Sequence, residues 1–231
     1  MLKEWYQKII NPDYEQEKLL NFVHQFIQPK AKIVDIGCGY GRYLIPLKQA
    51  GYDVVGIEQN QHIVQHNVAQ GLNCLTPDDF KQDNRKFDAI ICSHIIEHFT
   101  PNDLFVFLNE HLAKLKENGY LFIATPLYSD HFYDDFDHVK PYHPLGLQMV
   151  FGKQKAQVQY YSNHHLTLQD IWFRKSPYFV SFHRAKYFKS CLSRSLQCYD
   201  LLLAILYRAS GGWLGKKDGW VGVFQKRERL S

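Results

Sequence analysis

The sequence has few cysteines, no long apolar run and no signal segment at its start. Its five cysteines, at positions 38, 74, 92, 191 and 198, form no C-x-x-C pair, which argues against a disulfide framework and a thiolate zinc site. The longest apolar run, residues 201–207, is far below the roughly 20 residues that span a bilayer. Charges appear too early for a signal peptide. We therefore expect a cytoplasmic protein.

Acidic residues are scarce in the last part of the chain. Residues 141–231 contain 14 Lys and Arg but only 4 Asp and Glu, whereas residues 1–140 contain 13 and 19. The length of 231 residues, with 45% hydrophobic and 22% charged residues, suits a single globular domain with a full core. The basic, aromatic-rich final part favours anionic partners such as phosphorylated sugars, lipid head groups or nucleic acid.

Residues 32–60, KIVDIGCGYGRYLIPLKQAGYDVVGIEQN, have the pattern of strand, glycine turn, helix, turn and strand. Three glycines follow the first strand at alternate positions, namely Gly37, Gly39 and Gly41. Without a Cβ, they let the backbone turn sharply and approach a ligand closely. Asp35 precedes them, and Glu58 ends the second strand, where an acid can bind the hydroxyls of a ribose. This pattern predicts a nucleoside site at the carboxyl edge of a doubly wound sheet.

The glycine spacing separates possible nucleosides. A dinucleotide loop has the spacing G-x-G-x-x-G, whereas this loop has G-x-G-x-G after an acid, which suits a ligand with an ammonium and a sulfonium. The stretch resembles the first motif of the class I S-adenosylmethionine-dependent methyltransferases, D-x-G-x-G-x-G, with Glu58 at the ribose-binding acid. The alternative is a structural turn in an unrelated α/β protein. The resemblance implies S-adenosylmethionine as cofactor and an α/β fold with a Rossmann-like seven-stranded sheet, helices on both faces and a helical insertion before the last strand.

The resemblance also assigns the remaining cofactor contacts. In that family a carboxylate and an apolar side chain after the third strand read the adenine, and Asp79 with Phe80 matches them in the turn formed by residues 76–80, with Asp78 as the alternative reader. Ser93 and His94 follow the fourth strand and would form the floor of the reaction centre. The full predicted cofactor set is Asp35, Gly37, Cys38, Gly39, Gly41, Glu58, Gln59, Asp79, Phe80, Ser93 and His94.

Strand and helix patterns alternate along the chain, which predicts one domain over residues 1–231. In the resembled family such a leading segment packs on the sheet and often forms a lid over the cofactor, so residues 1–28 are expected to form a helical lid. Trp5, Tyr6 and Tyr14 could close over the cofactor, although ordinary packing is the favoured role for them. The sixth strand is expected at residues 158–161 and the last at residues 220–225. Residues 162–219 between them are too long for a hairpin loop and need structure of their own.

Residues 128–146 hold four aspartates and three histidines, and they follow the fifth strand. Their Asp-His-Val-Lys-Pro-Tyr run is similar to the D-H-V-[RK]-P-[FY] signature of methyltransferases in bacterial cell-surface glycan and lipid assembly. That similarity implies a sugar, a lipid-linked glycan or a similar hydroxylic acceptor. Methyl transfer to a hydroxyl needs a base, and we expect His138 in that role, with Asp137 beside it and His143 as the second candidate.

A metal site is the rival interpretation of a neighbouring cluster. His94, Glu97 and His98 have the spacing that places three ligands on one helical face. The pattern is similar to the E-x-x-E-H magnesium site of ubiquinone-biosynthesis O-methyltransferases and small-RNA 2′-O-methyltransferases, in which a further histidine can complete the set. His94 replaces the first glutamate, and imidazole suits magnesium poorly. We therefore expect no functional metal here.

Residues 182–207 can form a helix with an apolar side and several cations. Such a helix packs on the body or on a second subunit, or it lies on an anionic membrane and binds a lipid-linked substrate, which would place the protein at the inner face of the membrane. RNA methylation is a further possibility, and the basic final part of the chain is its only support. RNA or quinol O-methylation and a non-catalytic cofactor-binding scaffold therefore remain alternatives to methylation of a glycan, and the sequence does not determine the oligomeric state.

Overall fold

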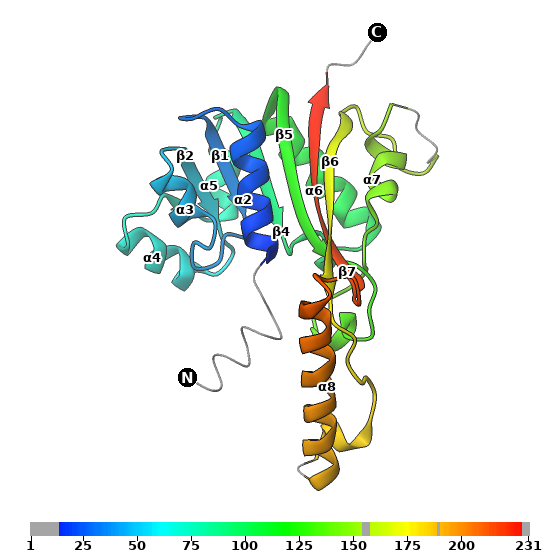
Figure 1. The fold of residues 1–231 in the computed structure, drawn as a ribbon. Helices are drawn as coiled ribbons and strands as arrows, with labels where there is room; N and C mark the ends of the chain where they lie inside the picture. Colours follow the sequence, from blue (N-terminus) through cyan, green and yellow to red (C-terminus); the bar gives the residue numbers. More distant parts are fainter. Residues whose placement is uncertain (1–13, 154–157, 189, 228–231) are drawn as a thin grey trace.

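The computed structural model describes residues 14–153, 158–188 and 190–227. A seven-stranded sheet lies at the centre, and one long helix extends away from it (Figure 1). The strand order is β3-β2-β1-β4-β5-β7-β6. All pairs from β3 to β5 are parallel, whereas β7 runs antiparallel to both β5 and β6. The predicted Rossmann-like sheet of seven strands is therefore confirmed.

The elements alternate between strand and helix for most of the chain. The strands are β1 (Lys32–Ile36), β2 (Asp53–Ile57), β3 (Cys74–Leu75), β4 (Phe87–Ser93), β5 (Leu115–Pro126), β6 (His165–Ser176) and β7 (Lys216–Arg227). The α-helices are α2 (Tyr14–Phe26), α3 (Leu44–Gln49), α4 (Gln61–Ala69), α5 (Pro77–Gln82), α6 (Pro101–Lys114), α7 (Pro144–Phe151) and α8 (Cys191–Ala209). Three short 3₁₀ helices are η1 (Ile96–His98), η2 (Phe132–Asp134) and η3 (Arg184–Lys186).

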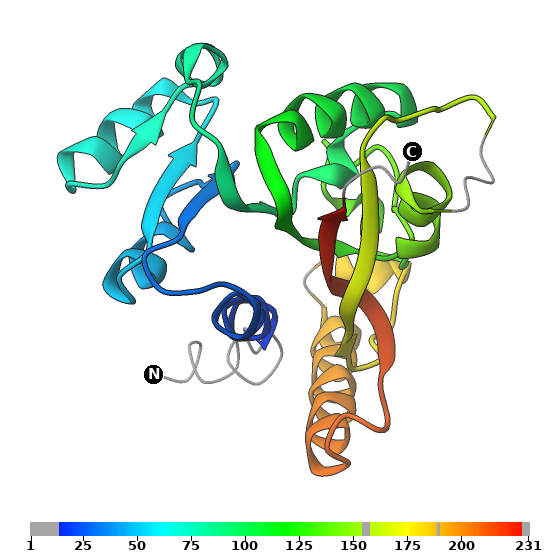
Figure 2. The same cartoon turned by 90° about the horizontal axis from the view of Figure 1, so that it is seen from above.

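Helices cover both faces of the sheet because successive strand residues point to opposite sides. One core lies under α2, α3 and α4, where Phe22 and Leu44 pack with Phe122 of β5. The other lies under α5, α6 and α7, where Leu108 and Leu147 pack with Ile90 of β4. Figure 2 shows α2 and α6 on opposite sides of the sheet. The strands are apolar on both faces, as expected for a buried parallel sheet.

The N-terminal helix α2 packs on the sheet, as expected. Leu19, Phe22 and Val23 are buried against it. Tyr14 begins the helix and is about half exposed. The other two aromatic residues of the predicted lid, Trp5 and Tyr6, lie outside the described residues.

The predicted sixth strand is wrong in position. Residues 158–161 form no strand, and β6 instead occupies His165–Ser176, where it pairs with β7 from His165–Arg227 to Ser176–Lys216. The short aromatic run at 158–161 has strand propensity, but a strand also needs a partner along its length, and the partner is β7. The insertion before the last strand therefore covers residues 177–215 instead of 162–219.

The insertion helix is also shorter at its start than expected. It begins at Cys191, because Ser190 and Ser193 form reciprocal side-chain hydrogen bonds of a capping box. The residues before Ser190 fold back along the helix, and the Val180 amide donates to Asp200 Oδ1 at 2.9 Å. Within the described residues, no helix is both long and apolar enough to cross a membrane.

Candidate active site

The glycine loop joins β1 to α3 at the carboxyl edge of the sheet. The amides of Gly37 and Cys38 both donate to the Ile57 carbonyl at the end of β2, at 2.8 and 3.0 Å. Gly37 has a φ of 71°, and a Cβ added there would collide with Ile95 Cδ1. At Gly39, with a φ of 50°, a Cβ would meet no heavy atom within 4 Å. Backbone hydrogen bonds thus hold the loop against the end of β2, and the space next to Gly39 is open, as a ligand-binding loop requires.

Glu58 lies directly against this loop. Its Oε2 accepts from the Gly39 amide at 3.1 Å, and its Oε1 accepts from the Asn60 amide at 2.9 Å. Gln59 is exposed beside it. Cys38 differs, because its Sγ lies 3.6 Å from Cys74 Sγ in the buried core. The carboxylate of Glu58 is therefore at the predicted place for a ribose, whereas Cys38 contributes only backbone to the cradle.

Asp35 is buried under the loop, and its Oδ2 has no hydrogen-bond partner within the described part of the chain. Burial raises the pKa of Asp35 to about 8, because water no longer stabilises the carboxylate. An unpaired buried carboxyl oxygen is costly unless a ligand compensates it. The residues therefore fit a cationic cofactor, as S-adenosylmethionine is.

The predicted adenine readers lie at the start of a helix. Residues 76–80 do not form an open turn, because Thr76 caps α5 and Pro77 begins it. The Asp79 amide donates to Thr76 Oγ1, and Asp79 Oδ2 accepts from the same hydroxyl at 2.6 Å. Asp78 is exposed next to Lys81. The Phe80 ring is buried and packs between Phe87 and His111, so most of its surface serves the core.

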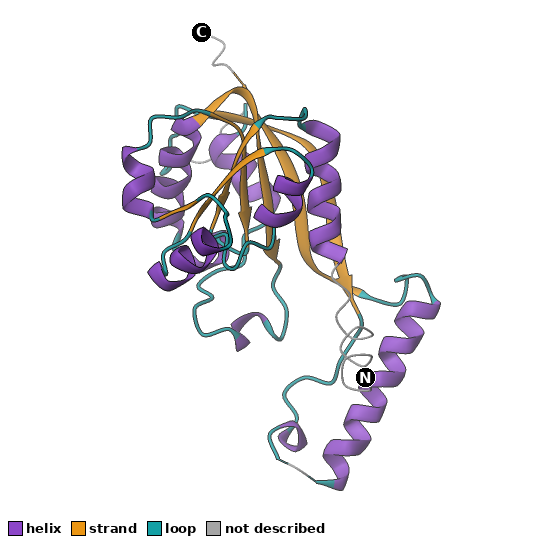
Figure 3. Ribbon diagram, turned by 90° about the vertical axis from the view of Figure 1, so that its left-hand side faces the viewer, coloured by secondary structure: helices purple, strands orange, loops and turns teal. Residues whose placement is uncertain are grey.

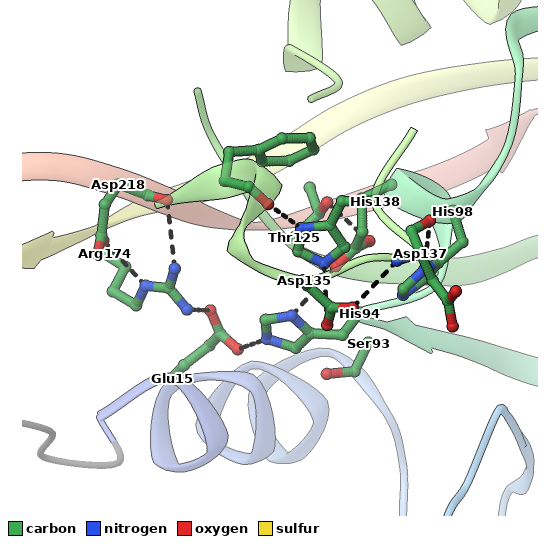
Figure 4. Close-up of polar contacts among 12 residues, drawn as sticks. Glu15, Ser93, His94, His98, Thr125, Asp135, Asp137, His138, Arg174 and Asp218 are labelled. Carbon is green, nitrogen blue, oxygen red and sulfur yellow. Dashed lines mark hydrogen bonds and ion pairs between the residues drawn. The ribbon is translucent and has the colours of Figure 1, made fainter. Parts of the chain in front are cut away.

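The floor of the reaction centre follows β4. Ser93 Oγ lies 3.1 Å from the Tyr43 hydroxyl, and the backbone turns sharply at His94, whose φ is 55°. Both His94 ring nitrogens face carboxylates (Figure 4). Nε2 lies 2.6 Å from Glu15 Oε1, and Nδ1 lies 3.1 Å from Glu97 Oε1.

His94 belongs to a chain of charged groups that the sequence did not reveal. Arg174 on β6 contacts Glu15 Oε2 at 2.8 Å and Asp218 Oδ1 on β7 at 2.9 Å (Figure 4). Burial disfavours a charge on His94, but the hydrogen bond to Glu15 and the nearby Glu97 carboxylate outweigh it and raise the pKa of His94 to about 9. His94 is therefore an imidazolium at neutral pH. It is 79 residues from Glu15, so no local pattern could signal the contact.

The His138 ring is held in one orientation by its backbone contact. Its Nδ1 lies 2.6 Å from the Phe132 carbonyl oxygen, which can only accept a hydrogen bond. Nδ1 therefore carries a proton, and Nε2 is the ring nitrogen that can exchange a proton with an acceptor. The carboxylate near Nε2 is that of Asp135, at 3.7 Å.

The predicted pairing of His138 with Asp137 is therefore not the one that the structure forms. The Asp137 carbonyl instead accepts from His98 Nδ1 at 3.1 Å, since residues adjacent in an irregular segment point in different directions. His143, the second candidate base, caps α7 by accepting from the Leu145 amide.

The rival metal face of His94, Glu97 and His98 on one helix is not formed, because a 3₁₀ helix begins only at Ile96 and both nitrogens of His94 already face carboxylates. Another trio is assembled. Potential ligand atoms of Glu97, His98 and His138 lie within 4.8 Å of one another. Glu97 is fully buried, and its Oε2 accepts from Thr125 Oγ1 at 2.9 Å. One carboxylate and two imidazoles fit zinc or ferrous iron better than magnesium.

Comparison with known proteins identifies the family. A family described as "Methyltransferase domain" matches residues 7–195. A S-adenosylmethionine-dependent methyltransferase from Archaeoglobus fulgidus has a similar structure, with a TM-score of 0.59, 18% identity and coverage of 96% of this chain and 99% of that one. Magnesium protoporphyrin IX methyltransferase from Synechocystis PCC 6803 gives a TM-score of 0.51 at 13% identity, over 93% of this chain and 80% of that one.

Sequence relatives point to one named activity. A ubiquinone biosynthesis O-methyltransferase of Pelagibacter ubique is 35% identical over 102 residues, and a mitochondrial one of Rattus norvegicus is 34% identical over 106 residues. These matches cover 41% of this chain, and 41% and 30% of the two relatives. The chain thus spans less than half the length of these relatives. Their names do not support the expected glycan- and lipid-assembly subtype. The family match over most of the sequence shows that the chain belongs to the methyltransferase-domain family, and its fold is that of the S-adenosylmethionine-dependent methyltransferases.

Proposed function

We propose that the protein transfers a methyl group from S-adenosylmethionine to a hydroxyl of a lipophilic acceptor of the quinol or phenol class. The observation that carries the proposal is the orientation of His138. Its Nδ1–H is held by the Phe132 carbonyl, which makes Nε2 the ring nitrogen that would take a proton from a hydroxyl.

Backbone hydrogen bonds hold the segment that carries His138 against Glu97 in the reaction centre. The amides of Val139 and Lys140 donate to the Glu97 carbonyl, at 2.9 and 3.1 Å. Two residues of the D-H-V-K-P-Y run thus position the loop through their backbone. The names of the sequence relatives favour a quinol. We therefore prefer a quinol acceptor to a sugar or lipid-linked glycan.

In the proposed mechanism the chain binds, orients and removes a proton. Asp35 and the glycine loop would hold the methionine part of the donor, Glu58 and Gln59 the ribose, and residues around Asp79 the adenine. The bound donor supplies a methyl group that is open to in-line attack. His138 Nε2 accepts the proton of the acceptor hydroxyl, and the Asp135 carboxylate stabilises the imidazolium that results. Positioning the hydroxyl in line supplies much of the rate.

A second mechanism is favoured by the cluster of Glu97, His98 and His138. In that mechanism these residues would hold a transition-metal ion, which would lower the pKa of the acceptor hydroxyl. His138 Nε2 would then be a ligand, so it could not also be the base.

The test is a transfer assay with labelled S-adenosylmethionine on hydroquinones, simple phenols, oligosaccharides and RNA. We expect methylation of a phenolic hydroxyl. His138→Ala should lower kcat by about 10²-fold or more and leave the donor affinity unchanged, because it removes only the base. His143→Ala is the matched control and should retain turnover, since His143 caps a helix.

Three outcomes would contradict the proposal. Methylation of oligosaccharides or of RNA alone would replace the acceptor. Donor binding without turnover on any acceptor would favour a non-catalytic scaffold. Unchanged turnover of His138→Ala would remove His138 as the base.

A further inference from the structure

The insertion between β6 and β7 forms an arm, which we define as residues 177–188 and 190–215. Its main element is α8, and the arm extends away from the body of the protein (Figures 1 and 3). It is not a loose loop. Asp200 is buried and accepts from the Val180 amide, Ala204 is fully buried, and the Tyr207 hydroxyl donates to the Lys175 carbonyl at 2.7 Å.

The arm starts at the same edge of the sheet as the candidate active site. Both β5 and β6 are antiparallel to β7, so the two strands run in the same direction and end at the carboxyl edge. Arg174, near the end of β6, contacts Glu15, which contacts His94. The base of the arm is therefore two ion pairs away from the reaction centre.

The exposed side of α8 is apolar along one stripe. Leu192, Tyr199, Leu202 and Leu206 are all exposed, and their spacing of seven, three and four residues places them on one face. Other parts of the arm also expose aromatic side chains, among which Trp213 is 80% exposed, Phe182 75% and Tyr187 74%. An exposed apolar stripe with several exposed aromatic rings on the same arm indicates an interaction site.

The charges of the arm are almost all positive. Residues 177–215 contain five Lys and Arg and a single acid, Asp200, which is buried and bonded to the Val180 amide. Arg184 and Arg194 are exposed, and the Arg184 guanidinium lies 5.2 Å from the centre of the Phe188 ring. The arm as a whole therefore exposes cations and aromatic rings but no carboxylate.

A pocket of about 470 Å³ at the base of the arm is also lined by aromatic rings and cations. Its lining includes four aromatic rings and two cations, namely Tyr14, Trp172, Phe173, Tyr207, Lys175 and Arg208. Aromatic rings and cations together match the interface of a bilayer, where acyl chains meet phosphate groups. Two copies of the arm would instead bring like charges together, which opposes self-association through this surface.

We propose that the arm binds the surface of an anionic membrane, with its aromatic and leucine stripe in the interface and its cations at the phosphates. Because the arm and the reaction centre share one edge of the sheet, binding would hold the site next to the lipid. The benefit for catalysis rests on the proposed lipophilic acceptor, whereas the membrane contact itself can be measured without donor or acceptor.

The experiment is flotation of the full chain with vesicles of phosphatidylcholine alone or of phosphatidylcholine mixed with phosphatidylglycerol. We expect flotation only with the anionic vesicles and less of it at high salt. The double variant Arg184→Ala with Arg194→Ala should weaken partitioning roughly fivefold for each cation removed. Replacing Phe182, Tyr187 and Trp213 by Ser should lower it further, because the interface then loses three aromatic anchors.

Matched controls lie on the body of the protein. Val68→Ser with Val106→Ser removes exposed apolar side chains from α4 and α6, and Lys81→Ala with Lys153→Ala removes exposed cations. Both controls should float like the unchanged protein. Donor affinity, measured by calorimetry, should be equal in all variants and shows that they are folded.

Several results would overturn the proposal. Absence of flotation with anionic vesicles would do so, as would equal flotation of the arm variants and the controls. Loss of single-stranded RNA binding in the arm variants without loss of flotation would make RNA the partner. A dimer in light scattering that only the arm variants lose would make a second copy the partner. Failure of flotation with intact quinol methylation would reject the arm alone. Flotation without quinol methylation would reject the proposed function and leave the membrane contact.

Discussion

At the scale of the residue, the protonation of Asp35 affects both the stability of the fold and the binding of the cofactor. Burial raises its pKa from an ordinary 3.8 to about 8. The folded protein therefore binds a proton that the unfolded chain releases, so the contribution of Asp35 to stability is complete below about pH 4 and is lost as the pH rises through 8. A cationic donor favours the carboxylate and should remove that proton.

We therefore predict that donor affinity rises with pH up to about 8 and then levels off. Calorimetry at pH 7 in two buffers of different ionisation enthalpy should show that a proton is released on binding. Asp35→Asn should abolish that release, since the amide does not titrate. Equal heats in the two buffers for the unchanged protein would show that Asp35 does not respond to the donor.

Glu15 supports a second prediction at this scale. It is buried and contacts both His94 and Arg174, so Glu15→Gln removes one of the two carboxylates that each of these cations contacts. We expect the free energy of unfolding to fall by about 3 kcal/mol, as for other buried pairs that lose one partner. Denaturant unfolding measures this change. Asp78→Asn is the control, because its exposed pair with Lys81 should contribute under about 1 kcal/mol. A similar small loss for both variants would contradict the buried network.

At the scale of the element, the glycine loop was predictable and the charged network was not. The loop depends on residues within one strand-turn-helix unit, so their spacing alone indicates it. The network joins α2, the turn after β4 and two edge strands, and Glu15 is 159 residues from Arg174. The sixth strand was misplaced for the same reason, because its partner β7 lies some 50 residues later and local propensity cannot choose between candidate segments.

The loop allows a paired test. In Gly37→Ala the new Cβ collides with Ile95, so we expect loss of stability by about 1–2 kcal/mol or more along with loss of donor binding. Gly39→Ala carries the same left-handed backbone cost, since its φ is 50°, but its Cβ meets no heavy atom within 4 Å, so its stability loss should be the smaller of the two while donor binding is still lost. Thermal unfolding and calorimetry separate the two effects. Equal stability losses in the two variants would mean that the loop is strained as a unit.

The cluster of Glu97, His98 and His138 can be tested apart from catalysis. If it holds a transition metal, Co²⁺ should produce visible absorption that both His98→Ala and His138→Ala abolish. If His138 is the base, turnover should fall with His138→Ala and persist with His98→Ala, without any metal requirement. Absence of absorption with the unchanged protein would reject the metal mechanism.

At the scale of the whole molecule, the predicted catalytic residues and the arm lie in different parts of the sequence. The acidic first 140 residues hold the predicted cofactor and base, and the basic remainder supplies the arm. The arm and the reaction centre meet at one edge through the ion pairs of Arg174 and Glu15. This arrangement suits an acceptor that stays in a lipid phase, because a site far from that edge would need the acceptor to leave the bilayer.

The arrangement predicts different kinetics for two forms of one acceptor. With a hydroquinone that carries a long isoprenoid tail in anionic vesicles, Arg184→Ala with Arg194→Ala should raise KM several-fold and leave kcat unchanged, because fewer molecules reach the surface. With a short, water-soluble hydroquinone, the same variant should match the unchanged protein, since neither arginine contacts the reaction centre residues described above. If the variant loses kcat on both acceptors alike, the arm acts on the reaction centre itself, and its role as a membrane anchor would have to be abandoned.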